Sequence, residues 1–193
     1  MTLPKNKKIV LVLFCLLLPV FLLLLSYKIV LFFTPLTSAQ EDVFLFLEGK
    51  GELATEFTES EASHLEEVRN IMQYADHVFY VLLLAVTVIV TYYRKDKDFV
   101  LKLFGYGGKF TIATMLLLGF LSFLFFEGVF ALFHQIFFPQ GNWQFATDSL
   151  IIQTFSLDFF VIISRNIFLL TLFLGILFIL PKHLYRYVLR HRN

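Results

Sequence analysis

The sequence has one cysteine, Cys15, and charged residues make up only 16% of its 193 residues. A single cysteine excludes an intramolecular disulfide, a thiolate zinc site and an iron–sulfur cluster built by one chain. The formal net charge of +1 argues against a nucleic-acid partner, because such a partner requires a basic surface. A soluble domain contains roughly a quarter charged residues, so the composition favours another class of protein.

Hydrophobic residues, by contrast, make up 58% of the sequence and gather in four long runs. A helix needs about 20 residues to cross a hydrocarbon core about 30 Å thick. The first and fourth runs reach this length alone, and the second and third reach it when their neighbours are included. The sequence predicts an all-α integral membrane protein with four transmembrane helices, at residues 9–33, 78–93, 110–132 and 159–180.

Charges of opposite sign occupy alternate segments between these runs. The N-terminus, the loop 94–109 and the tail 181–193 together hold 12 of the 16 basic residues, and the positive-inside rule places them in the cytoplasm. Residues 34–77 hold ten acidic residues and residues 127–158 hold three. We expect both termini to be cytoplasmic and the segments 34–77 and 133–158 to form an extracellular cap. The first run exceeds a signal-peptide core, so we expect it to be retained.

The first outer segment begins with an apolar patch at residues 43–47, which predicts a strand or a loop on the membrane surface. A turn is expected at residues 49–51. Thr58 and Glu61 then match a capping box, and apolar residues recur at spacings of three and four after it. This periodicity predicts an amphipathic helix that runs into the second span.

The second outer segment contains the only tryptophan, Trp143, among several phenylalanines. An aromatic belt at the membrane interface accounts for these rings, but not for His134 among them or for Glu127 two helical turns earlier. In the fourth span, Arg165 is costly in hydrocarbon and should pair with Asp158 or Glu127. Residues 105–108 (GYGG) are interpreted as a flexible turn, since no strand precedes them.

Two histidines, His64 and His134, lie near the predicted outer membrane boundary. Imidazole accepts and donates protons near neutral pH, which suits acyl transfer from a lipid ester. His77 is a third candidate. The sequence has no His-Glu-x-x-His pair and no Gly-x-Ser-x-Gly nucleophile elbow, so it offers no motif for those zinc or serine enzymes.

At these histidines the sequence resembles a known family. Residues 64–69 (HLEEVR), and residues 133–138 (FHQIFF) followed by 141–143 (GNW), look like the two signatures of the lipoprotein intramolecular transacylases of Gram-positive bacteria. The resemblance implies four spans beneath an extracellular cap in a bacterial cell membrane. It also implies an enzyme that moves the sn-2 acyl chain of a lipoprotein's diacylglyceryl-cysteine to the cysteine α-amino group, giving a lyso-form lipoprotein without cofactor or metal.

For this reaction His64 and His134 are the predicted catalytic residues, one as base and the other as acid or oxyanion stabiliser. Aromatic rings would exclude water, Arg69 would hold the oxyanion or the substrate, and carboxylates would orient an imidazole. The predicted partners are diacylated lipoproteins and membrane lipids, with no nucleic acid. The supporting residues are Arg69, Glu67, Trp143, Phe133, Phe137, Phe138, Asp148, Glu127 and Arg165.

Two other functions fit the composition. In the first, the protein is not an enzyme, its cap binds a partner in the cell envelope and the histidines are structural. In the second, a small transporter or channel uses Glu127, Asp158 and Arg165 along a pore. The sequence shows no inverted repeat and no helix-breaking pair at mid-span, which argues against a transporter.

Overall fold

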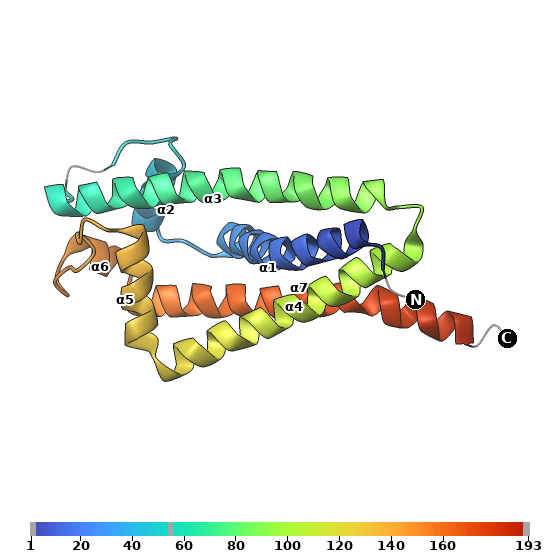
Figure 1. Ribbon diagram of the computed structural model, residues 1–193. Helices are drawn as coiled ribbons and strands as arrows, with labels where there is room; N and C mark the ends of the chain where they lie inside the picture. The colour runs from blue at the N-terminus through green and yellow to red at the C-terminus, as the bar shows by residue number, and fades with distance from the viewer. Residues whose placement is uncertain (1–2, 54–55, 191–193) are drawn as a thin grey trace. The chain divides into compact units, whose positions relative to one another are not determined.

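The computed structural model describes residues 3–53 and 56–190, with side chains up to residue 181, and these residues contain helices and no strands. Four helices are long and apolar enough to cross a membrane, namely α1, α3, α4 and α7, which confirms the predicted all-α membrane protein (Figure 1). In chain order the helices are α1 (Lys5–Phe33), α2 (Ser38–Leu47), α3 (Glu59–Tyr92), α4 (Lys97–Leu124), α5 (Phe126–Phe137), α6 (Leu150–Thr154) and α7 (Leu157–Arg190).

The chain folds into two compact units, and several helices pass from one unit into the other. Unit 1 comprises Met1–Val30, Phe79–Phe120 and Asn166–Asn193. Unit 2 comprises Leu31–Val78 and Leu121–Arg165. Unit 1 therefore contains most of the apolar helix length, and unit 2 contains both predicted outer segments.

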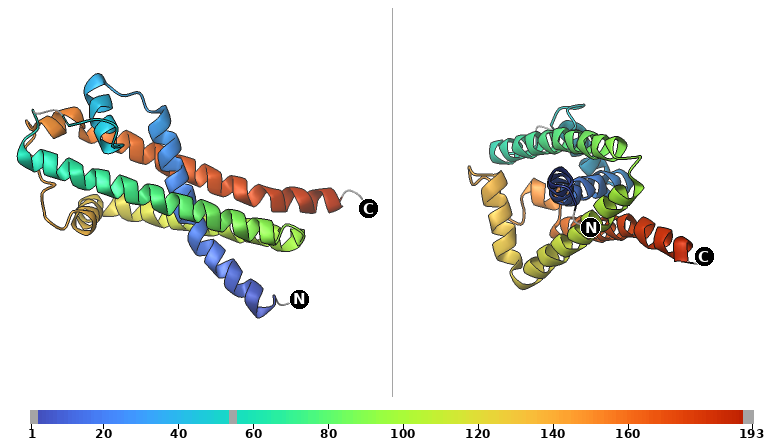
Figure 2. Two further views of the ribbon diagram at one scale, coloured as in Figure 1. Left: turned by 90° about the horizontal axis from the view of Figure 1, so that it is seen from above. Right: turned by 45° about the vertical axis from the view of Figure 1, so that its right-hand side comes forward.

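Close contacts between glycines and neighbouring helices organise unit 1, in which α1 crosses α4 and α7 obliquely (Figure 2). A Cβ atom added to Gly107 would lie 2.7 Å from Leu18 Cδ2, and one added to Gly108 would lie 2.6 Å from the Gly175 carbonyl oxygen. The predicted flexible turn at residues 105–108 is therefore wrong, because these residues are helical and their glycines let α4 approach α1 and α7. The predicted loop 94–109 likewise shortens, since α4 already begins at Lys97.

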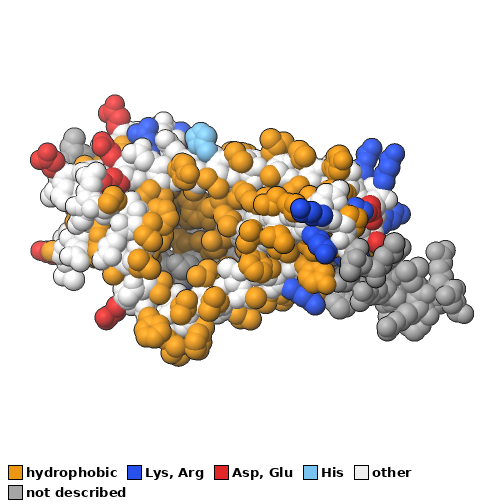
Figure 3. Space-filling model, viewed as in Figure 1, with side chains coloured by type: hydrophobic (Ala, Val, Ile, Leu, Met, Phe, Trp, Pro, Cys, Tyr) orange, Lys and Arg blue, Asp and Glu red, His pale blue; other side chains and the backbone are white. Residues whose placement is uncertain are grey.

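Basic and acidic residues are divided unequally between the two units. Unit 1 holds 13 Lys and Arg against two acidic residues, and unit 2 holds 13 Asp and Glu against three basic residues. Lys and Arg side chains gather over the turn between α3 and α4, and acidic side chains gather over the first turns of α3 and the segment before them (Figure 3). Each unit thus carries charge of predominantly one sign.

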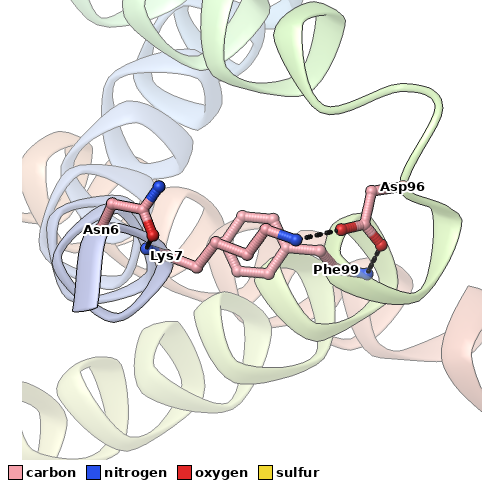
Figure 4. Close-up of polar contacts among 4 residues, drawn as sticks. All are labelled: Asn6, Lys7, Asp96 and Phe99. Carbon is pink, nitrogen blue, oxygen red and sulfur yellow. Dashed lines mark hydrogen bonds and ion pairs between the residues drawn. The ribbon is translucent and has the colours of Figure 1, made fainter. Parts of the chain in front are cut away.

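The start of α4 is tied to the start of α1 by Asp96 (Figure 4). Its Oδ1 accepts a hydrogen bond from the Phe99 amide at 3.1 Å, which caps α4. Its Oδ2 accepts one from Lys7 Nζ at 2.5 Å, and that ammonium also lies over the Phe99 ring. The hydrogen bond from Lys7, followed by that from Phe99, holds the pKa of Asp96 below its usual value.

A small apolar core joins α2, α3 and α6 of unit 2. The predicted strand or loop at residues 43–47 is wrong, because α2 continues to Leu47. Thr37 and Gln40 form a capping box at its start, and its apolar side chains then face the core at helical spacing. The buried core consists of Val43, Phe46, Leu47, Leu65, Ile151 and Phe155. The turn expected at residues 49–51 is confirmed, with Gly49 at a φ of 75°.

The predicted third span at 110–132 is interrupted. Phe125 leaves helical geometry, with φ −135° and ψ 45°, so α4 ends at Leu124 and α5 is a separate helix (Figure 1). No glycine or proline marks this break, so local sequence gives no signal for it. At about 1.5 Å per residue α5 is far too short to span a bilayer. His134 of α5 contacts Trp143 in the loop that follows this helix, with ring centroids 4.7 Å apart.

Candidate active site

His64 lies near the N-terminus of α3, outside the part of that helix that can cross a membrane. With 34 residues, α3 is about 50 Å long, much longer than a hydrocarbon core about 30 Å thick. The apolar run is its second half, residues 78–92, whereas four glutamates and Arg69 lie in its first eleven residues. Charged residues are excluded from hydrocarbon, so we treat residues 59–77 as the extramembrane part of α3.

A capping box starts the helix that carries His64, as the sequence predicts. The Glu61 amide donates to Thr58 Oγ1 at 3.3 Å, and Glu61 Oε2 accepts from the Thr58 amide at 2.8 Å. Leu65, one residue after His64, is buried in the core of unit 2. The cap and the buried Leu65 therefore set the direction in which the His64 side chain leaves the helix.

His134 lies on α5 in an aromatic cage. Its ring centroid is 4.0 Å from that of Phe130, 4.7 Å from Trp143 and 5.3 Å from Phe133. Its Nδ1 donates a hydrogen bond to the Phe130 carbonyl oxygen, at 2.8 Å. Because a carbonyl oxygen only accepts, Nδ1 carries the proton of the neutral ring and the lone pair lies on Nε2.

Phe138 brings the two histidines together. It is 5% exposed, and its ring centroid lies 4.5 Å from His64 and 5.5 Å from His134. Phe145 also contacts the His64 ring, with ring centroids 5.4 Å apart. Two imidazoles that are 70 residues apart in the sequence thus share one aromatic wall within unit 2.

The surroundings of His64 keep its imidazole neutral. Burial, followed by the electrostatic effect of His134, lowers the pKa of His64 from 6.5 to about 4. Its Nδ1 is buried and has no hydrogen-bond partner among the described residues. At pH 7 the ring is therefore uncharged and can donate one N–H.

Only some of the predicted supporting residues contact a histidine in the structure. The aromatic residues Phe133, Phe138 and Trp143 contact an imidazole directly. Phe137 packs against Phe133, with ring centroids 4.7 Å apart, and is linked to His134 by that ring.

Arg69 and Glu67 contact neither imidazole by a hydrogen bond or ion pair in the described residues. The Arg69 guanidinium lies 5.3 Å from the Phe46 ring centroid and next to the turn at Gly49, so it contacts α2 and its C-terminal turn. Glu67 buries one carboxylate oxygen that has no hydrogen-bond partner in the described part of the chain.

Three further candidates are exposed, namely Glu127, Asp148 and Arg165. Within the described residues, Arg165 forms no ion pair with Asp158 or Glu127, so neither partner expected for it is found. No set of three His, Cys, Asp or Glu side chains that could hold a metal ion is present in the same residues.

Sequence reasoning did not assign three residues to the site. Phe130 lies four residues before His134 on α5, so helical spacing was a usable signal for it. Asn142 donates from Nδ2 to Ser63 Oγ at 3.3 Å, and Glu61 reaches the backbone of Ile151 at 3.0 Å. Both join residues about 80 to 90 positions apart, and local sequence patterns carry no signal for such contacts.

Comparisons with known proteins agree with this fold. A family model described as Lipoprotein intramolecular transacylase Lit matches residues 36–160. The fold is similar to a solved structure of the membrane integral lipoprotein intramolecular transacylase Lit from Bacillus cereus, with a TM-score of 0.76, 19% identity and 97% of each chain covered. A variant of that protein with a histidine replaced by alanine gives a TM-score of 0.77 at 19% identity, covering 97% of this chain and 95% of that one.

Among curated proteins, an uncharacterized protein of Aquifex aeolicus is 29% identical over 128 residues. The match covers 63% of this chain and 57% of that protein, so it spans little more than half of the relative's length.

The four apolar helices and the matching fold define a multi-pass, all-helical integral membrane protein. The family model covers well over half of its length. The chain belongs to the lipoprotein intramolecular transacylase family, a family of acyltransferases, which confirms the resemblance seen at residues 64–69 and 133–143.

Proposed function

We propose that this protein moves the acyl chain on the sn-2 oxygen of a lipoprotein's diacylglyceryl-cysteine to the α-amino group of the same cysteine. The product is a lyso-form lipoprotein. The observation that carries the proposal, beyond family membership, is the pair of imidazoles on either side of Phe138. A neutral imidazole and an imidazole with a defined lone pair are the groups that amine attack on an ester requires.

In this proposal His134 is the general base. The hydrogen bond from Nδ1 to the Phe130 carbonyl leaves the Nε2 lone pair available, whereas the lowered pKa makes His64 a poor proton acceptor. An α-amino group titrates near pH 8, so the ammonium form first loses one proton to the solvent. The neutral nitrogen then attacks the ester carbonyl carbon while His134 takes a second proton from it. The bond from that carbon to the sn-2 oxygen then breaks, and His134 returns the proton to that oxygen.

His64 is assigned to the oxyanion. As the nitrogen adds, negative charge develops on the carbonyl oxygen, and a neutral imidazole N–H can stabilise that charge without a proton transfer. An ester and an amine become an amide and a hydroxyl within one molecule, so no co-substrate is consumed. The enzyme's contribution is then mainly to hold two groups of a flexible lipid in a reactive geometry.

The remaining residues provide the surroundings of this chemistry. Phe133, Phe138 and Trp143 would exclude water and pack along acyl chains, because they are the rings in contact with His134. Arg69 lies against α2, so we assign it to holding the peptide part of the substrate. Unit 2 would form the extracellular cap, with both termini in the cytoplasm.

The test is the mass of the lipoprotein N-terminal peptide after expression in a host without N-acylating enzymes. The wild type should convert the diacyl form to the lyso form. His134→Asn keeps a side-chain N–H for the Phe130 carbonyl but lacks Nε2, and it should lose about 10² to 10⁴-fold in rate. His64→Ala should lose a comparable factor, as for removal of an oxyanion donor, about 10² to 10³-fold.

Two outcomes would overturn the proposal. If the wild-type protein converts no native lipoprotein, the proposed activity is rejected. Full conversion by both histidine variants would remove these histidines from catalysis. The alternative, a cap that binds an envelope partner with structural histidines, predicts no lyso product from the wild type. Glu66→Gln is the matched control, because Glu66 is an exposed residue of the same helix, and it should retain wild-type conversion.

A further inference from the structure

Glu61 is a buried carboxylate that binds two segments at once. The residue is 2% exposed. Its Oε2 accepts from the Thr58 amide and the Thr58 hydroxyl, both at 2.8 Å. Its Oε1 accepts from the Ile151 amide at 3.0 Å. Helix capping occupies one of its oxygens, and the other reaches the first turn of α6.

The short helix α6 is therefore held at both ends by side chains of other helices. Glu61 of α3 accepts from its N-terminal backbone, and Gln40 of α2 donates from Nε2 to the carbonyl oxygen of Thr154 at 2.9 Å. Five residues cannot form a stable helix by themselves, so these contacts and the buried Ile151 keep α6 in place. The loop before it, residues 138–149, carries the rings that cover His64.

We infer that Glu61 is a positioning residue for the proposed reaction: it holds the loop 138–149 against α3, which keeps Phe138 and Phe145 on His64 and fixes the spacing of the two histidines. The inference rests on the proposed function. His64 lies one helical turn after Glu61, so a single carboxylate links the helix of one histidine to the loop that leads away from the other.

The charge of Glu61 fits this role. Burial acts to raise its pKa, but hydrogen bonds from the Ile151 amide, the Thr58 amide and hydroxyl, and the Leu150 amide outweigh burial. The pKa of Glu61 is consequently lowered, and the carboxylate stays ionised at neutral pH. Hydrogen bonds to an ionised acceptor are roughly twice as strong as neutral ones, so this carboxylate holds α6 more firmly than an amide would.

The test uses Glu61→Gln in the full-length protein, with Glu59→Gln as the matched control. Gln keeps the size of the side chain but replaces one acceptor oxygen by a donor, so it cannot satisfy both Thr58 and Ile151. Glu59 is an exposed acidic residue of the same first turn, and its substitution removes equal charge. We expect kcat of Glu61→Gln to fall about 10 to 100-fold, as for misplacement of reacting groups by about 1 Å.

A spectroscopic readout separates positioning from mere loss of folded protein. His134 of α5 acts electrostatically on His64, and Glu61 and Glu67 lie three residues before and after His64 on its own helix. If the loop loosens in Glu61→Gln, water reaches His64, and NMR titration of labelled histidine should show its pKa rise from about 4 toward 6.5. Amide exchange at Ile151 should accelerate, and Glu59→Gln should change neither value.

Three results would overturn the inference. These are an unchanged Ile151 exchange rate, an unchanged His64 titration, or a loss of activity that equals the loss of folded protein. Should Glu61→Gln not fold, Gln40→Ala releases the other end of α6 and should shift both readouts in the same direction. The His64 titration and the Ile151 exchange rate are both measured without substrate. A wild type that makes no lyso product would therefore count against the proposed function only, and these two measurements would still test the contact between Glu61 and the loop.

Discussion

His64 and His134 differ in what holds each ring, and that difference is the basis of the roles proposed for them. A backbone carbonyl fixes the tautomer of His134, whereas aromatic rings and burial surround His64. Two residues of one type can thus act as base and as neutral hydrogen-bond donor because their environments differ. The sequence predicted both histidines but not this division of roles.

The pKa of His64 provides a prediction at the residue scale. In a titration of the wild-type protein by NMR, the His64 imidazole should stay neutral until about pH 4. In His134→Ala its pKa should rise but remain below 6.5, because the electrostatic cause is removed and burial persists. A His64 pKa at 6.5 in the wild type would show that the ring is hydrated.

The same shift has a consequence for stability. The unfolded chain binds a proton on His64 as the pH falls below 6.5, and the folded chain binds it only near 4. Where the unfolded state binds more protons, stability falls with falling pH. This imidazole should therefore lower the free energy of unfolding between pH 6.5 and 4, and leave it unchanged above that range.

The candidate site was partly readable from sequence at this scale. Residues 64–69 and 133–143 placed both histidines and the aromatic wall, because the motif residues are close together along the chain. Arg69 was expected to hold the oxyanion or the substrate, and the contact of its guanidinium with Phe46 was not predicted. A helical wheel gives the direction of a side chain but not which neighbouring element it meets.

At the scale of helices, glycine positions decide how closely α4 packs. Gly108 lies against the backbone of Gly175, so α4 and α7 touch at residues without side chains. Gly128 on α5 has nothing within 4 Å of where its Cβ would be. Close packing therefore requires glycine at position 108, whereas position 128 has room for a larger side chain.

Gly108→Ala should therefore lower thermal stability and Gly128→Ala should not. The new methyl group of Gly108→Ala would meet the Gly175 carbonyl at 2.6 Å, and forced overpacking costs about 1–3 kcal/mol. In Gly128→Ala the added helix propensity should be neutral or stabilising by about 0.4–1 kcal/mol. Thermal unfolding in detergent measures both, and equal midpoints for the two variants would contradict this packing.

At the scale of the whole molecule, the distribution of charge is the main organising feature. Unit 1 holds 13 of the basic residues and unit 2 holds 13 of the acidic residues. The near-zero net charge is thus the sum of two opposite charges in different parts of the protein. From the positive-inside rule we propose that unit 2 faces outward.

Cysteine labelling tests that orientation. With Cys15 replaced by serine, Lys50→Cys in the exposed turn of unit 2 should react with a membrane-impermeant maleimide in intact cells. Lys95→Cys, exposed between α3 and α4, should react only after permeabilisation. Labelling of Lys95→Cys in intact cells would reverse the proposed topology.

The sequence by itself determined the four apolar helices, the capping box of Thr58 and Glu61, the segregation of charge and both histidines. Each of these follows from the spacing of residues along the chain, where hydrophobicity, capping and charge act locally. Only the tertiary structure decided that residues 43–47 are helical, that α4 ends at Leu124, and that Glu61 holds α6. The hydrogen bonds of Glu61 and Gln40 to α6 join segments about 90 to 110 residues apart, and such contacts leave no periodic signal in the sequence.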